Sequence, residues 1–156
     1  MTRILLVCMA NVCRSPTAWV VARQRVLELG LSKWLDFDSA GTHVRYPGER
    51  MDPRAASVLA ARHYKPAKTR SRQISAPDFQ RFDLIVAMDE SNLAALKKQC
   101  APQHHSKLHL LLDFAPALGV REVPDPYYGN LAGFERVLDL CEAGLAGLIR
   151  AQARAP

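Results

Sequence analysis

Short runs that are apolar at every position alternate along this chain with longer segments of helical periodicity. The runs at 4–7 and 84–87 are typical of parallel strands that helices cover on both faces. The pattern predicts strands in "RILLVC", "LDFDSAG", "DLIVAM" and "KLHLLLDF", and helices over about 16–29, 53–63, 90–100 and 131–151. We therefore expect an α/β fold: a doubly wound, mostly parallel four-stranded sheet with helices on both faces. The length of 156 residues suits a single domain over 1–156.

Two features of this pattern indicate where a site would lie. In doubly wound sheets, ligands bind beyond the carboxyl ends of the strands, at a topological switch point. The stretch "CMANVCRSP" directly follows the first predicted strand and therefore occupies such a position. Two long loops, 41–52 and 115–130, are rich in Pro and Gly, and loops of this length in a compact domain are usually functional or disordered.

The loop that follows the first predicted strand has the composition of an anion site. A helix that begins near Ser15 or Pro16 would direct backbone N–H groups and its positive dipole end at one point. Such a cradle stabilises a thiolate, so we expect Cys8 to be a nucleophile. Five residues separate Cys8 from Arg14, which lets the loop fold back and present the planar guanidinium to two oxygens of a phosphate.

A proton donor for the leaving group is expected on a different segment of the chain. The second long loop contains "VPDPYYG", in which Asp125 lies between two prolines and precedes Tyr127 and Tyr128. We predict that Asp125 is the general acid and afterwards, as a base, activates the water that hydrolyses the phosphocysteine. The two tyrosines are expected to wall a pocket for an aromatic leaving group.

Through these residues and several further segments, the chain resembles the low-molecular-weight protein tyrosine phosphatases. The loop "CMANVCRSP" is similar to the family's phosphate loop and "DPYYG" to its acid loop, while "SAGT", "DPRA", "RSRQI" and "MDESNL" resemble further family segments in family order. The resemblance implies hydrolysis of phosphotyrosine and small aryl phosphates through a phosphocysteine, without a cofactor or a metal. It implies that Cys8 is the nucleophile, that Arg14 binds phosphate and that Asp125 is the acid.

The resemblance also implies the surroundings of these three residues. Ser15 would assist the thiolate, and Asn11 would shape the loop through hydrogen bonds to neighbours such as Ser39, with Asp89 as a further support. The residues expected to bind substrate or phosphate are Met9, Ala10, Asn11, Val12, Cys13, Ser15, Arg45, Tyr46, Tyr127 and Tyr128.

This chain departs from the family pattern at three positions. Ala10 stands where the family mostly has Gly, so strain on the order of 1 kcal/mol would follow if that residue needed a positive φ. Arg45, followed by Tyr46, stands where an aromatic residue often lines the pocket mouth, which affects substrate preference. Thr69 stands where a loop-supporting histidine is common, so the network behind Asn11 is expected to differ.

The four cysteines suggest different roles. The resemblance implies that Cys13 forms a reversible disulfide with the nucleophile and protects it from over-oxidation; the alternative is a cysteine that packs beneath the loop. Cys100 and Cys141 are expected to be structural. No spacing typical of a zinc site is present, and "QHHSKLH" has no nearby carboxylate or cysteine to complete a ligand set.

Charge and hydropathy limit the partners. The net charge of +6 suits anionic substrates, and no nucleic-acid-binding signature accompanies it. No apolar stretch approaches the roughly 20 residues that span a bilayer, and the N-terminus lacks the features of a secretory signal, so we expect a cytoplasmic protein. The expected partners are a phosphotyrosine-containing protein as substrate and inorganic phosphate as product, with the enzyme a monomer or weak dimer. The basic run "HYKPAKTRSR" is either a solvated face or a docking surface for protein substrates.

Two other functions are weighed against the phosphatase. A thiol-dependent arsenate reductase uses a related loop but needs a closely spaced cysteine pair after the middle strand, where this chain has only Cys100. A low-activity phosphate-binding or redox-sensing module would need Arg14 and the backbone N–H groups but no acid, so the presence of both Cys8 and Asp125 argues against it.

Overall fold

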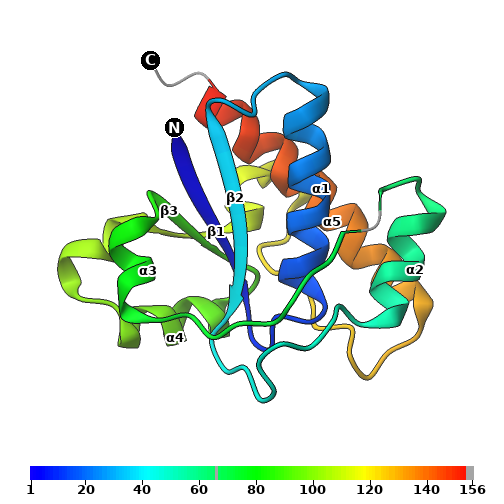
Figure 1. The fold of residues 1–156 in the computed structure, drawn as a ribbon, viewed down its shortest axis with the longest axis horizontal. Coiled ribbons are helices and arrows are strands. Elements are labelled where there is room, and N and C mark those ends of the chain that lie inside the picture. The colour runs from blue at the N-terminus through cyan, green and yellow to red at the C-terminus, as the bar shows by residue number, and fades with distance from the viewer. Residues whose placement is uncertain (66, 154–156) are drawn as a thin grey trace.

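The centre of the molecule is a parallel four-stranded sheet in the order β2-β1-β3-β4 (Figure 1). The computed structural model describes residues 1–65 and 67–153. The fold class predicted from the sequence is confirmed. Its strands are β1 (Thr2–Cys8), β2 (Leu35–Gly41), β3 (Leu84–Ala87) and β4 (Leu108–Leu110).

Helices cover both faces of this sheet. Figure 1 shows α1 and α5 together on one side, with α2 beyond them, and α3 and α4 on the other side. Side chains of β1 alternate between the two layers: Ile4 and Leu6 belong to the core under α1 and α5, and Leu5 and Val7 to the core under α3 and α4. Because β1 is buried on both faces, its sequence is a continuous apolar run. The helices are α1 (Arg14–Glu28), α2 (Pro53–Ala61), α3 (Ala76–Arg81), α4 (Glu90–Gln99) and α5 (Leu131–Ala153).

The order of the strands creates a switch point at the carboxyl end of β1. The chain first pairs β1 with β2 on one side, and the next strand, β3, pairs with β1 on the other side. Cys8 is the last residue of β1 and aligns with Gly41 at the end of β2. The loop between β1 and α1 therefore lies where connections leave the sheet in opposite directions, which is where such folds bind ligands.

The structure differs from the predicted elements in three places. The segment "KLHLLLDF" forms a strand only over Leu108–Leu110 and then turns into a 3-10 helix, Leu111–Phe114. The helix expected to reach residue 63 ends at Ala61, because His63 has a φ of 65° and cannot continue it. The short helix α3 was not predicted; it is capped by the Asp78 carboxylate, which accepts a hydrogen bond from the Ser75 backbone N–H.

Two further 3-10 helices, Pro102–Lys107 and Pro116–Leu118, lie in the connections before β4 and before α5. Across the described residues, 1–65 and 67–153, no helix combines the length and apolar character that a membrane crossing requires.

Candidate active site

The loop between β1 and α1 is held in shape by Asn11. This residue is 2% exposed and has a φ of 60°, a conformation that Asn adopts more readily than most residues. Its side-chain amide donates hydrogen bonds to Ser15 Oγ at 2.8 Å and to Ser39 Oγ at 3.1 Å. Its side-chain oxygen accepts from the backbone N–H of Arg72 at 2.9 Å. One buried side chain thus ties the loop to β2 and to the segment before α3.

Cys8 lies at the base of this loop with 3% of its surface exposed. Its Sγ is 3.0 Å from Ser15 Oγ. Because Ser15 Oγ accepts from Asn11, its own proton is left for Cys8 Sγ or for the Ala40 carbonyl oxygen, which lies at 3.3 Å. Ser15 is therefore placed to donate a hydrogen bond to a thiolate.

Arg14 begins α1, is 3% exposed and is fixed from two sides. Its Nη1 donates to the Asp89 carboxylate and, at 3.0 Å, to the carbonyl oxygen of Val123. Burial disfavours the charge of Arg14, but the nearby Cys8 sulfur, the hydrogen bond to Asp89 and the charge of Asp125 raise its pKa overall. A buried, fixed and permanently charged guanidinium is suited to binding two oxygens of a phosphate.

Asp125 enters the site from the long loop before α5. Its Oδ2 lies 3.8 Å from Arg14 Nη2, and its Oδ1 accepts a hydrogen bond from the backbone N–H of Tyr127 at 3.0 Å. The Asp125 side chain is 44% exposed, so solvent protons reach it. The Arg54 guanidinium lies 5.6 Å from the centre of the Tyr127 ring, which connects this loop to α2.

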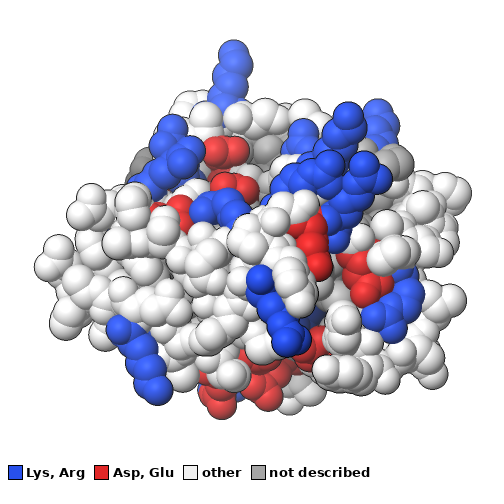
Figure 2. Space-filling view, turned by 60° about the horizontal axis from the view of Figure 1, so that its bottom comes forward, with Lys and Arg blue, Asp and Glu red and all other residues white. Residues whose placement is uncertain are grey.

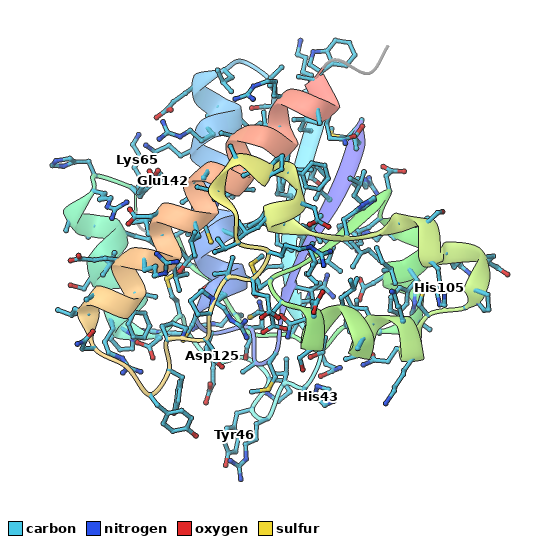
Figure 3. The ribbon with its side chains drawn as sticks, turned by 180° about the vertical axis from the view of Figure 1, so that it is seen from behind. His43, Tyr46, Lys65, His105, Asp125 and Glu142 are labelled. Carbon is cyan, nitrogen blue, oxygen red and sulfur yellow. The ribbon has the colours of Figure 1, made fainter. Side chains whose placement is uncertain are left out.

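These segments enclose a cavity of about 310 Å³ over the phosphate loop. Figure 3 shows Asp125, His43 and Tyr46 at the same edge of the molecule, around the loop that follows β1. Asn11 and Ser15, which were expected to contact phosphate, do not line the cavity; their side chains bond to each other, to Ser39 and to the Ala40 carbonyl oxygen instead. The sequence-predicted residues that do line it are Cys8, Met9, Ala10, Val12, Cys13, Arg14, Arg45, Tyr46, Asp125, Tyr127 and Tyr128.

Two lining residues, His43 and Glu49, were not predicted. Both belong to the long loop 41–52, whose length indicated a functional role but whose path could not be deduced from its sequence. His43 Nδ1 lies 3.0 Å from Thr42 Oγ1, and the His43 backbone N–H donates to the carbonyl oxygen of Met9.

The three departures from the family pattern have structural consequences. Ala10 is not among the non-glycine residues with a positive φ, so the strain considered for it does not arise; Asn11 makes that turn instead. Arg45 and Tyr46 lie at the cavity mouth, with the Arg45 guanidinium 5.8 Å from the Tyr46 ring centre. The hydrogen-bond partners of the Asn11 side chain are Ser15, Ser39 and the Arg72 backbone N–H, not Thr69, and the Arg72 guanidinium is held by Asp38 and Asp78.

The second loop cysteine, Cys13, is 5% exposed and lines the same cavity as Cys8. Burial, followed by the charges of Asp52, Cys8 and Asp125, raises the pKa of the Cys13 thiol to about 12. All four cysteines are free thiols. Among the described residues, no group of three or more His, Cys, Asp or Glu side chains is arranged to hold a metal ion.

Comparison with known proteins identifies the family. The family model described as Low molecular weight phosphotyrosine protein phosphatase matches residues 3–155. The chain belongs to this family. It is 41% identical over 152 residues to a low molecular weight protein-tyrosine-phosphatase of Streptomyces coelicolor, a match that covers 96% of this chain and 92% of that one.

Solved structures agree with this assignment. A crystal structure of a protein tyrosine phosphatase from Entamoeba histolytica, with Hepes in the active site, superimposes with a TM-score of 0.92 at 37% identity, covering 96% of both chains. A low molecular weight phosphotyrosine phosphatase from Vibrio cholerae O395 superimposes with a TM-score of 0.93 at 33% identity, covering 99% of this chain and 98% of that one. The chain is therefore a cysteine-dependent protein-tyrosine-phosphatase, a hydrolase whose substrates are phosphoproteins.

Proposed function

We propose that this low-molecular-weight phosphatase hydrolyses phosphotyrosine in two steps, with Cys8 as nucleophile, Arg14 as phosphate ligand and Asp125 as general acid and base. One observation carries the assignment: three residues from two separate segments, the loop 8–14 and the loop before α5, line a single cavity with the Cys8 thiol at its base. Transfer of a phosphoryl group from a phosphate monoester requires a nucleophile, a cation and a proton donor, and this cavity contains all three.

In the first step, the Cys8 thiolate attacks phosphorus and the bond from phosphorus to the tyrosine oxygen breaks. Asp125, protonated at the start of this step, gives its proton to the departing phenolate oxygen. Arg14 and the backbone N–H groups of 9–13 bind the phosphoryl oxygens, where charge is spread in the transition state. The products of this step are the dephosphorylated tyrosine and a phosphocysteine.

In the second step, the Asp125 carboxylate takes a proton from water, and the water oxygen attacks phosphorus. The bond from phosphorus to Cys8 Sγ breaks, inorganic phosphate leaves and the thiolate is restored. The Ser15 hydroxyl, 3.0 Å from Sγ, stabilises the thiolate as it departs. Asn11, Ser39 and Asp89 hold the loop and Arg14 in place for both steps.

The cavity walls support a preference for tyrosine over shorter side chains. Cys8 lies at the base of the cavity, and the mouth is formed by Arg45, Tyr46, Tyr127 and the largely exposed Tyr128. An aromatic ring can pass between these side chains and bring its phosphate to the sulfur. We further infer that the enzyme is cytoplasmic, since a reducing compartment keeps the catalytic thiol free. We also infer that it is a monomer or weak dimer.

We also propose that Cys13 protects the nucleophile. Peroxide oxidises the Cys8 thiolate to a sulfenic acid; Cys13 then attacks its sulfur, water leaves and a Cys8–Cys13 disulfide forms. Both cysteines line one cavity, which supports this step. Two thiol equivalents from a reductant restore the enzyme.

Steady-state hydrolysis of aryl phosphates under reducing conditions tests the catalytic assignment. Cys8→Ser should abolish turnover, and Asp125→Ala should lower kcat by about 10²- to 10⁴-fold for a poor leaving group and much less for a good one. Asp36→Ala, which removes an exposed carboxylate on β2, is the matched control and should retain native rates. If the kcat of Asp125→Ala falls by the same factor for the poor and the good leaving group, Asp125 is not the acid.

A further inference from the structure

A second cavity, of about 370 Å³, lies beside α2 and shares no lining residue with the active site. It lies between α1, α2 and the segments 50–51, 64–65 and 67–70. Its floor is apolar: Val20 and Leu59 are buried core residues, and Met51 and Ala67 pack against the same core. A concave site of this size with an apolar floor is typical of small-molecule pockets.

The rim of this cavity is basic. Its four charged lining residues are all cations, and none of them forms an ion pair within the described part of the chain. The carboxylate of Glu142 lies close to this region in Figure 3, but it is already bonded to Arg62 and Tyr64. Figure 2 shows a dense group of blue side chains on this face of the molecule, on the same side as α2 in Figure 1. The rim residues are Arg50, Lys65, Lys68 and Arg70.

This combination selects an amphiphilic anion. Unpaired cations around a low-dielectric floor attract negative charge more strongly than the same cations dispersed over a flat surface. An aryl or short acyl group would cover the floor, and a carboxylate, sulfonate or phosphate group would face the rim. A molecule without charge would leave the cations unpaired, and a molecule without an apolar body would leave the floor exposed to water.

The cavity is connected to the phosphate loop through two of its flanking segments, 50–51 and 67–70. Met51 is followed by Asp52, whose backbone N–H donates to the carbonyl oxygen of Val12 at 2.8 Å. The second segment continues into Arg72, whose backbone N–H is bonded to Asn11. The residues adjoining the two segments are bonded to each other: the Ser71 backbone N–H donates to the Glu49 carbonyl oxygen, and the Glu49 backbone N–H donates to Ser71 Oγ.

We propose that this cavity is an effector site for a small amphiphilic anion and that its occupation changes the affinity of the phosphate loop for phosphate. A ligand wedged between the segments 50–51 and 67–70 restrains the residues that hold Val12 and Asn11. Coupling between two sites is reciprocal, so phosphate changes the affinity for the effector by the same factor. Binding to the cavity is independent of the catalytic roles proposed above; the coupling rests on the loop 8–14 being the phosphate site.

Binding is tested with the fluorescent aryl sulfonate anilinonaphthalenesulfonate, titrated into the whole protein with and without saturating inorganic phosphate. With phosphate present, the native protein should still bind one dye molecule saturably. Ala60→Phe places a ring in the cavity from the exposed side of α2 and should weaken this binding at least about tenfold. Ala61→Phe, which changes the next exposed residue of α2, one that does not line the cavity, is the matched control and should bind as the native protein does.

Charge reversal tests the rim. Lys68→Glu together with Arg70→Glu should weaken dye binding at least about tenfold, whereas Lys98→Glu on α4 should leave it unchanged. If the dye binds Ala60→Phe as tightly as the native protein, or if phosphate competes fully with the dye, the dye binds elsewhere and the proposal is overturned. If the dye does not bind but the double reversal raises KM for an acidic phosphopeptide and not for an aryl phosphate, the rim docks protein substrates and the effector site is wrong.

Coupling is tested by the inhibition constant of inorganic phosphate against aryl phosphate hydrolysis, measured with and without the dye. The constant should change at least threefold in the native protein and in Ala61→Phe, and should not change in Ala60→Phe. A constant that the bound dye leaves unaltered overturns the coupling. Dye binding measured on Cys8→Ser, which has the cavity but no turnover, separates a failure of this proposal from a failure of the catalytic assignment.

Discussion

At the scale of single residues, Asn11 links the geometry of the phosphate loop to the chemistry of Cys8. Its positive φ makes the turn, and its side chain fixes Ser15, the hydroxyl that faces the sulfur. The same side chain binds Ser39 and the backbone of Arg72. Loss of Asn11 therefore affects both the stability of the loop and the environment of the thiolate.

Asn11→Ala and Asn11→Gly separate these two contributions. Asn11→Ala leaves buried partners without hydrogen bonds and adds strain at positive φ, so the free energy of unfolding should fall by about 2 to 4 kcal/mol. Asn11→Gly loses the same bonds without the strain and should be about 1 kcal/mol more stable than the alanine variant. Urea unfolding measures the effect on the stability of the loop. The effect on the environment of the thiolate is measured by kcat, which should fall in both variants. Equal stability of Ala, Gly and native proteins would contradict this role.

The raised pKa of Cys13 sets the pH dependence of its redox role. Because the folded pKa is about 12, Cys13 is a thiol at neutral pH. As long as the pH stays below that pKa, each rise of one pH unit increases the thiolate fraction of Cys13 about tenfold. Closure of the Cys8–Cys13 disulfide after peroxide treatment should therefore accelerate from pH 7 to pH 9. A reductant added afterwards should restore the activity of the native enzyme far more completely than it restores the activity of Cys13→Ser. Equal recovery of the two proteins would mean that Cys13 only packs beneath the loop.

At the scale of elements, the packing of α5 decides how the chain continues after β4. The sequence "KLHLLLDF" has the composition of a strand, yet Leu111 is fully buried in a 3-10 helix beneath α5. A Cβ on Gly144 would lie 2.6 Å from Leu111 Cγ, and one on Gly147 would lie 1.8 Å from the carbonyl oxygen of Phe114. The two glycines let the helix approach this segment closely.

Alanine substitutions in α5 test this close approach. Gly147→Ala should lower the free energy of unfolding by about 2 kcal/mol or more, because the new methyl group meets backbone that cannot move aside cheaply. Gly133→Ala in the same helix is the matched control: its Cβ would have no neighbour closer than 3.7 Å, so it should be neutral or slightly stabilising. Thermal or urea unfolding compares the two, and equal effects would contradict the packing described for α5.

This packing also explains what the sequence could and could not predict. Local signals located β1, α1 and the loop 8–14, because strand pattern, proline position and catalytic residues are contiguous there. The end of β4 depends on α5, which lies far along the chain, and no local pattern reveals it. The helix α3 was missed although "SAPD" contains a capping box.

The candidate site shows the same division between local and distant signals. Cys8, Arg14 and Asp125 could be proposed from short motifs. His43 and Glu49 reach the cavity only through the path of a long loop, and the support of Asn11 by Arg72 bridges segments 61 residues apart.

At the scale of the whole molecule, the net charge of +6 acts on how substrates arrive. Figure 2 shows the face to which the carboxyl ends of the strands point: basic side chains gather most densely on one side of it, and acidic side chains lie among them and at its lower edge. A positive field over this face raises the encounter rate of acidic phosphoproteins and is screened by salt.

Salt dependence measures this field. Raising the ionic strength from about 0.01 M to about 0.15 M shortens the screening length from about 30 Å to about 8 Å. The value of kcat/KM for an acidic phosphopeptide should fall at least threefold, and that for a basic phosphopeptide of equal length should not fall. A small aryl phosphate serves as the reference for effects on the chemical steps. Identical salt profiles for the two peptides would show that the surface charge does not guide substrates.

The transfer of phosphate through Cys8, with Asp125 assisting its release, is tested most directly by trapping the intermediate. Asp125→Ala is mixed with an aryl phosphate that has a good leaving group, quenched in acid within milliseconds to seconds, and digested for mass spectrometry. We expect one phosphoryl group on the peptide that contains Cys8, in higher yield than in the native enzyme because water is no longer activated. A quenched enzyme that is turning over but has no phosphoryl group on Cys8, or has it on another residue, would contradict this mechanism.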